Sequence, residues 1–294
     1  MHFKIWRFPK PGLSTQSTKI PHVLLIVLLA LTFANIKSQP FQNSDNESVT
    51  ESFINPAPEV IPGLREWQGK VGFYEVPKNF RIVVENSSFS LLEKSIEIFA
   101  GDLKFFFKHD IAVVSGSDNE TGIFISLNPA DSTLGREGYK LSIDNGIRLE
   151  ATTPEGIFTG TRTILQLLNL YGNNIPKGRA LDYPMYERRG FMLDVGRKFF
   201  RLEFLQDYIR ILSYYKMNEF HVHLNDNGFK QFFENDWNKT YSAFRLESET
   251  YPGLAAEDGH YTKDEFRQLQ ELGIMYGVNV IPEIDVPAHS LAFT

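Results

Sequence analysis

The chain has 294 residues, of which 42% are apolar and none is cysteine. This composition is typical of a globular protein of about two domains, and it excludes disulfides, a thiolate nucleophile and sulfur-ligated zinc or iron–sulfur sites. The formal charge is −6, and the four basic residues among the first nineteen leave 26 basic against 36 acidic residues in the rest. An acidic body argues against a nucleic acid as partner, because phosphate contacts need clustered lysine and arginine.

The first 38 residues have the pattern of a secretory signal peptide. Four basic residues precede or adjoin an apolar run, 23–34, which has 12 residues against the roughly 20 that span a bilayer. We therefore expect residues 1–38 to be a signal peptide and the protein to be secreted or periplasmic, without stable membrane insertion after cleavage. An uncleaved anchor is the alternative. Residues 39–58 are polar, rich in Asn and Ser, and end in prolines, which predicts a linker.

A small α+β domain is predicted for residues 59–180. The β-rich runs lie at 80–84, 122–127, 139–143 and 147–151, and the periodic helical run at 90–107. Asn145-Gly146 separates the last two β-rich runs and is a strong hairpin signal. Thr153 followed by Pro154 predicts the start of a second helix. Nothing in this domain brings reactive side chains together.

Residues 181–294 alternate strand and helix patterns. Strands are predicted at 190–195, 219–224 and 278–284, and helices at 202–216 and after the capping box of Thr262 and Glu265. Such alternation predicts parallel strands and an α/β fold, here the first three strands of a (β/α)8 TIM barrel. A complete barrel takes about 250 residues. We therefore expect the chain to be a truncated piece of a longer protein.

Polar residues gather where these three strands end, which is where parallel α/β folds place their sites. They are Asp194 and Arg197, then His221, His223 and Asp226, then Glu283, Asp285 and His289. Because side chains alternate along a strand, His221 and His223 share one face, as do Glu283 and Asp285. A buried network of ion pairs without catalytic function is one reading. A metal-dependent hydrolase that uses His221 and His223 is another, since two imidazoles at this spacing can share an ion.

Ordered motifs at these positions resemble one known family. They are Arg189-Gly190-x-x-Leu193-Asp194-x-x-Arg197, Phe220-His221-x-His223-Leu224, and Ile281-Pro282-Glu283-x-Asp285-x-Pro287-x-His289-Ser290. Together they resemble glycoside hydrolase family 20, the β-N-acetylhexosaminidases. Residues 59–180, with Glu137-Gly138-Tyr139, are similar to the α+β domain that precedes the family's barrel. The resemblance covers about residues 59–294.

The resemblance implies removal of terminal β-linked N-acetylhexosamine, GlcNAc or GalNAc, from glycans. The implied mechanism is retaining and substrate-assisted, without metal or cofactor: the 2-acetamido carbonyl of the sugar attacks the anomeric carbon, and water opens the resulting intermediate. The family's acid/base Asp-Glu pair would lie beyond Thr294. We therefore expect the chain alone to be inactive.

The resemblance also assigns roles to individual residues. It implies that Arg189 binds the sugar hydroxyls at C3 and C4, and that Asp226 and His289 form a relay behind the acid/base Glu. His223, Glu283 and Asp285 would line the pocket floor. We accordingly expect Arg189, Asp226 and His289 to lie at the same end of the sheet.

Two departures from the family pattern concern loops beside the expected pocket. The segment Asp226-Asn227-Gly228-Phe229-Lys230 is one residue shorter than the family's, and Ala288 stands where glycine is common. These differences leave the exact substrate open. A catalytically inactive sugar-binding relative and a lacto-N-biosidase-like enzyme that releases disaccharides are the alternatives within the family.

Overall fold

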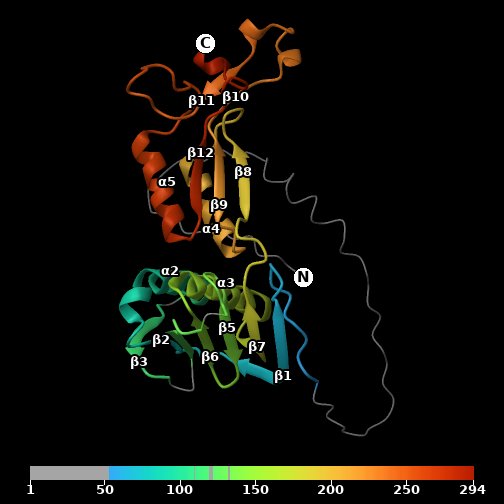
Figure 1. Ribbon diagram of the computed structural model, residues 1–294, viewed down its shortest axis with the longest axis vertical. Coiled ribbons are helices and arrows are strands. Elements are labelled where there is room, and N and C mark those ends of the chain that lie inside the picture. Colours follow the sequence, from blue (N-terminus) through green and yellow to red (C-terminus); the bar gives the residue numbers. More distant parts are fainter. Residues whose placement is uncertain (1–52, 109, 119–121, 132) are drawn as a thin grey trace, which may run out of the picture. The chain divides into compact units, whose positions relative to one another are not determined.

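The computed structural model describes residues 53–294 except 109, 119–121 and 132 (Figure 1). The expected signal peptide, and the expected linker up to residue 52, lie outside the described residues. In the part that is described, no helix combines the length and the apolar character needed to cross a membrane.

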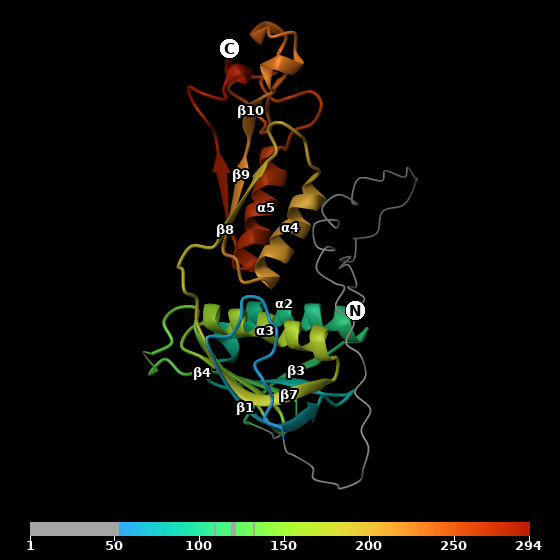
Figure 2. The ribbon, with the colours of Figure 1, turned by 90° about the vertical axis from the view of Figure 1, so that its right-hand side faces the viewer.

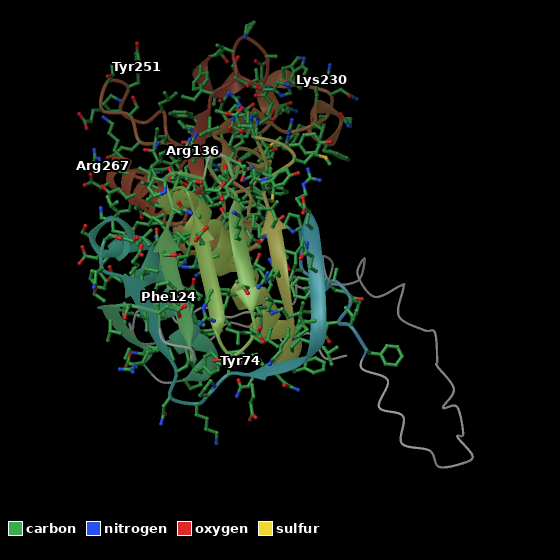
Figure 3. All side chains as sticks on the ribbon, turned by 60° about the horizontal axis from the view of Figure 1, so that its bottom comes forward. Tyr74, Phe124, Arg136, Lys230, Tyr251 and Arg267 are labelled. Carbon is green, nitrogen blue, oxygen red and sulfur yellow. The ribbon has the colours of Figure 1, made fainter. Side chains whose placement is uncertain are left out.

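Residues up to Asp182 form a mixed seven-stranded sheet. Its strands are β1 (Glu66–Glu75), β2 (Arg81–Glu85), β3 (Ala112–Gly116), β4 (Ile123–Leu127), β5 (Tyr139–Ile143), β6 (Ile147–Ala151) and β7 (Asn174–Asp182), in the order β1-β7-β5-β6-β4-β2-β3. Helices α2 (Phe89–Phe107) and α3 (Pro154–Tyr171) cover one face of the sheet (Figure 1). Figure 3 shows the other face, where Phe124 marks β4.

Local sequence signals explain several of these elements. β5 and β6 occupy the predicted residues and pair antiparallel, and the Asp144 amide donates to the Gly146 carbonyl over 3.0 Å to close the hairpin. The Thr153 hydroxyl accepts a 3.1 Å hydrogen bond from the Gly156 amide and thereby caps α3, as predicted. The predicted α+β content of this region is confirmed.

The end of the expected linker belongs to this sheet domain. Asn55 is 8% exposed, and its side-chain amide donates to the Gly72 and Lys177 carbonyls over 2.6 and 3.0 Å. A buried amide with these partners is fixed, because leaving them unpaired would cost free energy. The expected boundary at residue 181 also shifts, since β7 continues to Asp182 in register with β1 and β5.

Three parallel strands form the second sheet. They are β8 (Gly190–Asp194), β9 (Glu219–His223) and β12 (Asn279–Glu283), in the order β12-β9-β8. Helices α4 (Leu202–Tyr214) and α5 (Lys263–Met275) pack on the same side of this sheet (Figure 2). The hydrophobic core between them includes Leu205, Ile209, Phe220, Val222, Leu269 and Val280. The predicted α/β alternation is therefore confirmed, with the capping box of Thr262 and Glu265 present at the start of α5.

Loops at the carboxyl ends of these strands are held by further elements that the sequence did not reveal. A short hairpin, β10 (Asn225–Asn227) with β11 (Ser242–Phe244), follows β9. Arg245 is fully buried and donates to the Val195 and Gly196 carbonyls over 2.8 and 3.0 Å. It also pairs with Asp258 over 2.6 Å. Arg245, directly after β11, thus connects the hairpin to the loop after β8.

Candidate active site at the carboxyl ends of three strands

Three polar residues lie in one row across the three-stranded sheet. Asp194, His223 and Glu283 are the last residues of β8, β9 and β12, and they are register partners on neighbouring strands. Their side chains therefore share the face opposite the helices. The Glu283 carboxylate lies 3.3 Å from His223 Nδ1 and 3.8 Å from His221 Nδ1. His221 and His223, which alternation predicts on one face, thus both lie near the same carboxylate.

Asp226 is the centre of the cluster. Its side chain is almost completely buried, and one of its oxygens lies 2.8 Å from His223 Nε2 and 2.8 Å from Arg197 Nη1. The other accepts from His289 Nδ1 over 2.7 Å and from the Asn227 amide over 2.6 Å. A buried carboxylate is stable only when paired and hydrogen-bonded. Here it joins residues that follow all three strands.

Asn225 positions the loop that carries His289. Its side chain is fully buried; Nδ2 donates to the Asp285 and His289 carbonyls over 3.0 and 2.8 Å, and Oδ1 accepts from the Asp285 amide over 2.9 Å. His289 has a φ of 57°, a conformation that is uncommon for a residue other than glycine. The backbone of Gly196 packs closely against that of Asp226, because a Cβ at Gly196 would lie 2.7 Å from the Asp226 amide nitrogen. These contacts hold Asp226 and His289 in one geometry.

The charges of this cluster support each other. Burial alone would raise the pKa of Asp226, but hydrogen bonds from His223, His289 and the Asn227 amide, with the nearby Arg197, lower it. Burial alone would lower the pKa of His223, but its hydrogen bond to Asp226 and the carboxylates of Asp194 and Glu283 raise it. Asp226 is therefore anionic at neutral pH, and His223 keeps its proton more readily than a free imidazole does.

Arg197 presents a guanidinium that is only partly used by the protein. Nη1 donates to Asp194 over 2.7 Å and lies 2.8 Å from Asp226, while Nε donates to the Asn227 carbonyl over 3.0 Å. In the portion of the chain that the structure covers, Nη2 has no hydrogen-bond partner. The side chain is 33% exposed. Arg197 is thus held by two carboxylates and still offers a donor group to a ligand.

Arg189 lies at the other end of the same strand. It precedes β8, and its donors are occupied: Nε donates to the Lys216 carbonyl over 2.7 Å, Nη1 to the carbonyls of Tyr186 and Glu187 over 2.7 and 3.1 Å, and Nη2 to Glu137. The expectation that Arg189 lies with Asp226 and His289 is therefore wrong. Its five-residue strand separates the two ends, and Arg197 is the arginine that reaches the cluster.

A cavity of about 1030 Å³ opens at the amino end, beside Arg189 and Glu137. Two of its lining residues bond to Glu137 of the seven-stranded sheet domain: Arg189 through Nη2, just before β8, and Asn218 through Nδ2 over 3.3 Å, just before β9. Catalytic groups in parallel α/β folds gather at the opposite end. We therefore interpret this cavity as part of the junction between the domains.

The sequence-based alternative of a metal site can be compared with this geometry. Among the described residues, two groups place three potential ligand atoms within 4.8 Å of one another: Asp194, His223 and Asp226, and His223, Glu283 and Asp285. Neither includes His221, whose side chain is 45% exposed. The metal site that the sequence allowed, with His221 and His223 as ligands, thus differs from both of these groups. Asp285 offers an oxygen within 4.8 Å of the ligand atoms of His223 and Glu283, and the role of these residues as a pocket floor stays a prediction.

Comparison with known proteins identifies both parts of the chain. Residues 57–183 match the model for "Glycosyl hydrolase family 20, domain 2", and residues 186–294 match the model for "Glycosyl hydrolase family 20, catalytic domain". The chain belongs to glycosyl hydrolase family 20. The resemblance inferred from the ordered motifs is thereby confirmed.

Relatives within family 20 are named for one activity. A Beta-hexosaminidase of Vibrio furnissii is 36% identical over 194 residues, which are 58% of this chain and 29% of that protein. Beta-hexosaminidase subunit B1 of Dictyostelium discoideum is 26% identical over 92% of this chain and 48% of its own length. The chain thus spans less than half the length of these curated relatives.

Solved structures of the family share the fold. The GH20 beta-N-acetylhexosaminidase from Streptomyces coelicolor A3(2) has a TM-score of 0.65 and 26% identity, covering 80% of this chain and 47% of that one. A mutant Streptomyces plicatus beta-hexosaminidase in complex with its product GlcNAc has a TM-score of 0.67 and 25% identity, covering 82% and 48%.

Proposed function

We propose that this chain is part of a β-N-acetylhexosaminidase and that it supplies the barrel's first three strands with their share of the sugar site. The substrates are glycans that end in β-linked GlcNAc or GalNAc. Family membership and relatives named beta-hexosaminidase support this proposal. So does one feature of the molecule: the buried Asp226 carboxylate joins Arg197, His223 and His289 at the carboxyl ends of the strands.

Arg197 binds the hydroxyls of the reacting sugar in this proposal. Asp194 and Asp226 fix its guanidinium, and the Nη2 group remains available. The two N–H groups of Nη2 can each donate to a hydroxyl oxygen, and the side chain stays charged at any physiological pH. The role that the resemblance suggested for Arg189 therefore passes to Arg197, eight positions further along the chain.

Asp226 and His289 form the relay. The anionic Asp226 holds His289 through Nδ1, so Nε2 of the half-exposed ring is directed away from the carboxylate. In a substrate-assisted mechanism, this ring would hold and tune the group that protonates the leaving oxygen. We assign that proton donor to no residue of this chain, which spans less than half the length of these relatives.

Export is also part of the proposal. The basic and apolar pattern of residues 1–38 supports a signal peptide. Amino-terminal sequencing of the mature protein recovered from the medium or periplasm tests this point. A start near residue 35 or 39 agrees with it, whereas a retained residue 1 contradicts it.

Turnover of a chromogenic β-N-acetylglucosaminide by the full-length protein tests the activity. We expect hydrolysis by the wild type, retention of anomeric configuration in the first product, and strong loss in Asp226→Asn. Binding of N-acetylglucosamine without turnover would instead identify an inactive sugar-binding relative. Failure to bind or cleave any N-acetylhexosaminide would refute the proposal.

A further inference from the structure

The hairpin loop after Asn227 carries three exposed aromatic side chains. Phe229, Phe232 and Trp237 are 54%, 76% and 53% exposed. All three belong to the connection between β10 and β11 (Figure 1). The rings of Phe229 and Phe232 are 6.3 Å apart and edge to face, and Lys230 Nζ lies 5.2 Å from the centre of the Trp237 ring. Exposed apolar groups gathered on one loop indicate a contact surface.

This loop has a defined conformation. The Gly228 amide donates to the Tyr241 carbonyl over 2.7 Å, which closes the base of the loop. A Cβ on Gly228 would lie 2.6 Å from the Phe233 ring, so Phe233 packs inward against the base. Asp236 caps the short helix η3 (Trp237–Lys239) by accepting from the Asn238 amide over 2.9 Å. The three exposed rings are thus presented on an ordered scaffold.

The aromatic loop adjoins the proposed sugar site directly. Arg197 Cζ lies 5.1 Å from the centre of the Phe229 ring, and Arg197 Nε donates to the Asn227 carbonyl at the start of the loop. Asn227 Oδ1 also accepts from the Leu291 amide over 2.9 Å, next to the segment that carries His289. Arg197, which binds the reacting sugar in our proposal, therefore also contacts the Phe229 ring of this loop.

We propose that Phe229, Phe232 and Trp237 form a second sugar subsite, which binds the pyranose next to the reacting N-acetylhexosamine. A pyranose presents C–H groups on its faces and hydroxyls around its edge, so a ring face buries apolar area against an aromatic side chain while the hydroxyls stay in water. Lys230 can donate to such hydroxyls from beside Trp237. The inference rests on the proposed function of the neighbouring site and adds to it a contact with the sugar that adjoins the reacting one.

The neighbouring pyranose can come from either side of the reacting sugar. A ring on the leaving-group side makes the subsite a determinant for oligosaccharide chains that are trimmed one sugar at a time. A ring on the non-reducing side makes the enzyme release disaccharides. The chemistry of recognition is the same in both cases, so the substrates used must separate them.

The test compares three substrates of the full-length protein. Methyl β-N-acetylglucosaminide has one ring, N,N′-diacetylchitobiose adds a ring on the leaving-group side, and a methyl β-glycoside of Galβ1-3GlcNAc adds one on the non-reducing side. The variants are Phe232→Ala and Trp237→Ala. Phe73→Ala is the matched control, because Phe73 on β1 is an aromatic residue of similar exposure, 50%, outside the site.

We expect kcat/KM for one of the two-ring substrates, relative to the one-ring substrate, to fall about fivefold to tenfold in both variants. The control should keep the wild-type ratio. Unchanged ratios for both two-ring substrates would overturn the subsite, as would an equal loss on all three substrates.

A wild-type protein that cleaves none of the three would refute the proposed function rather than the subsite. Calorimetry then decides the subsite, through the affinity for N,N′-diacetylchitobiose and for the Galβ1-3GlcNAc glycoside, each relative to that for N-acetylglucosamine. Loss of the relative affinity for either in Phe232→Ala supports the subsite, and retention of both overturns it.

Discussion

Replacing Asp226 by asparagine removes one negative charge from the polar cluster while keeping the size of the side chain. The wild-type carboxylate faces four donors: His223 Nε2, His289 Nδ1, Arg197 Nη1 and the Asn227 amide, all within 2.6–2.8 Å. A carboxylate accepts all four, whereas a side-chain amide has only one acceptor oxygen and turns an N–H toward donors on its other side. The variant removes part of the counter-charge of Arg197, whose side chain is one-third exposed.

The size of the effect follows from the burial of Asp226. Removing one partner of a buried ion pair costs about 3–5 kcal/mol, because the other charge stays desolvated. We take about 3 kcal/mol, since Arg197 keeps Asp194 as a second partner. For a structure of this size, about 3 kcal/mol corresponds to a Tm lowered by about 6–12 °C.

The effect depends on pH in a direction that the pKa shifts fix. Because the pKa of Asp226 is lowered, its contribution is present above its unfolded value, about 3.9, and is lost as the pH falls through the folded value. Because the pKa of His223 is raised, its contribution is present below its unfolded value, about 6.5, and is lost as the pH rises through the folded value. Both contribute fully between about pH 4 and 6.5.

Thermal unfolding at about pH 5.5 and about pH 3 measures both the size and the pH dependence. Asp207→Asn is the matched control, because Asp207 is half-exposed in an ion pair with Arg210, and exposed pairs contribute less than about 1 kcal/mol. We expect Asp226→Asn to lower the Tm far more than the control at pH 5.5, and the difference to shrink at pH 3. Equal losses in the two variants, or a difference that grows in acid, would refute the reasoning.

Three further predictions follow from the same structure. His289→Ala should lower turnover about 100-fold with little change in Tm, since the ring is half-exposed but holds a relay position; wild-type turnover would show that the relay assignment is wrong. Thr262→Ala should lower the free energy of unfolding by about 1 kcal/mol, because the capping box of α5 is lost, and an unchanged Tm would contradict this. Treatment with a chelator should leave turnover unchanged. If activity is lost, and if it returns on addition of a divalent metal, a metal-dependent hydrolase is favoured.

Local signals sufficed for much of the secondary structure. The Asn145-Gly146 turn and the cap at Thr153 act within a few residues, so β5, β6 and α3 could be predicted from sequence alone. β1 and β7 could not, because β1 is interrupted by a bulge after Gly69 and β7 contains Pro176 and Gly178. β1 and β7 pair with each other across about 100 residues of chain, which no local pattern encodes.

Some residues of the candidate site could likewise be predicted from the sequence, and others could not. Alternation along β9 placed His221 and His223 on one face, and the rule that parallel strands gather function at their carboxyl ends found Asp226 and His289. That same rule also distinguishes Arg189 from Arg197, since one precedes β8 and the other follows it. At about 3.3 Å per residue, a five-residue strand puts their Cα atoms well over 15 Å apart. Arg197, after the carboxyl end of β8, is therefore the arginine of this motif that reaches the cluster.

Asn225 had no sequence signal of its own. Its role depends on the Asp285 and His289 backbone groups about 60 residues later in the chain, and an asparagine after a strand is more often a turn residue. The buried Arg245 is similar, because its partners Val195 and Gly196 are some 50 residues earlier. Such positioning residues become visible only when the fold brings distant backbone groups together.

The affinity of the full-length protein for N-acetylglucosamine, measured by calorimetry in two arginine variants, tests the central claim that the sugar lies at the carboxyl ends of the strands. Arg197→Lys keeps the charge but removes the free Nη2 group, and we expect affinity to fall about tenfold or more. Arg189→Lys changes a residue at the amino end, and we expect wild-type affinity. Loss of affinity in Arg189→Lys with none in Arg197→Lys would contradict the account.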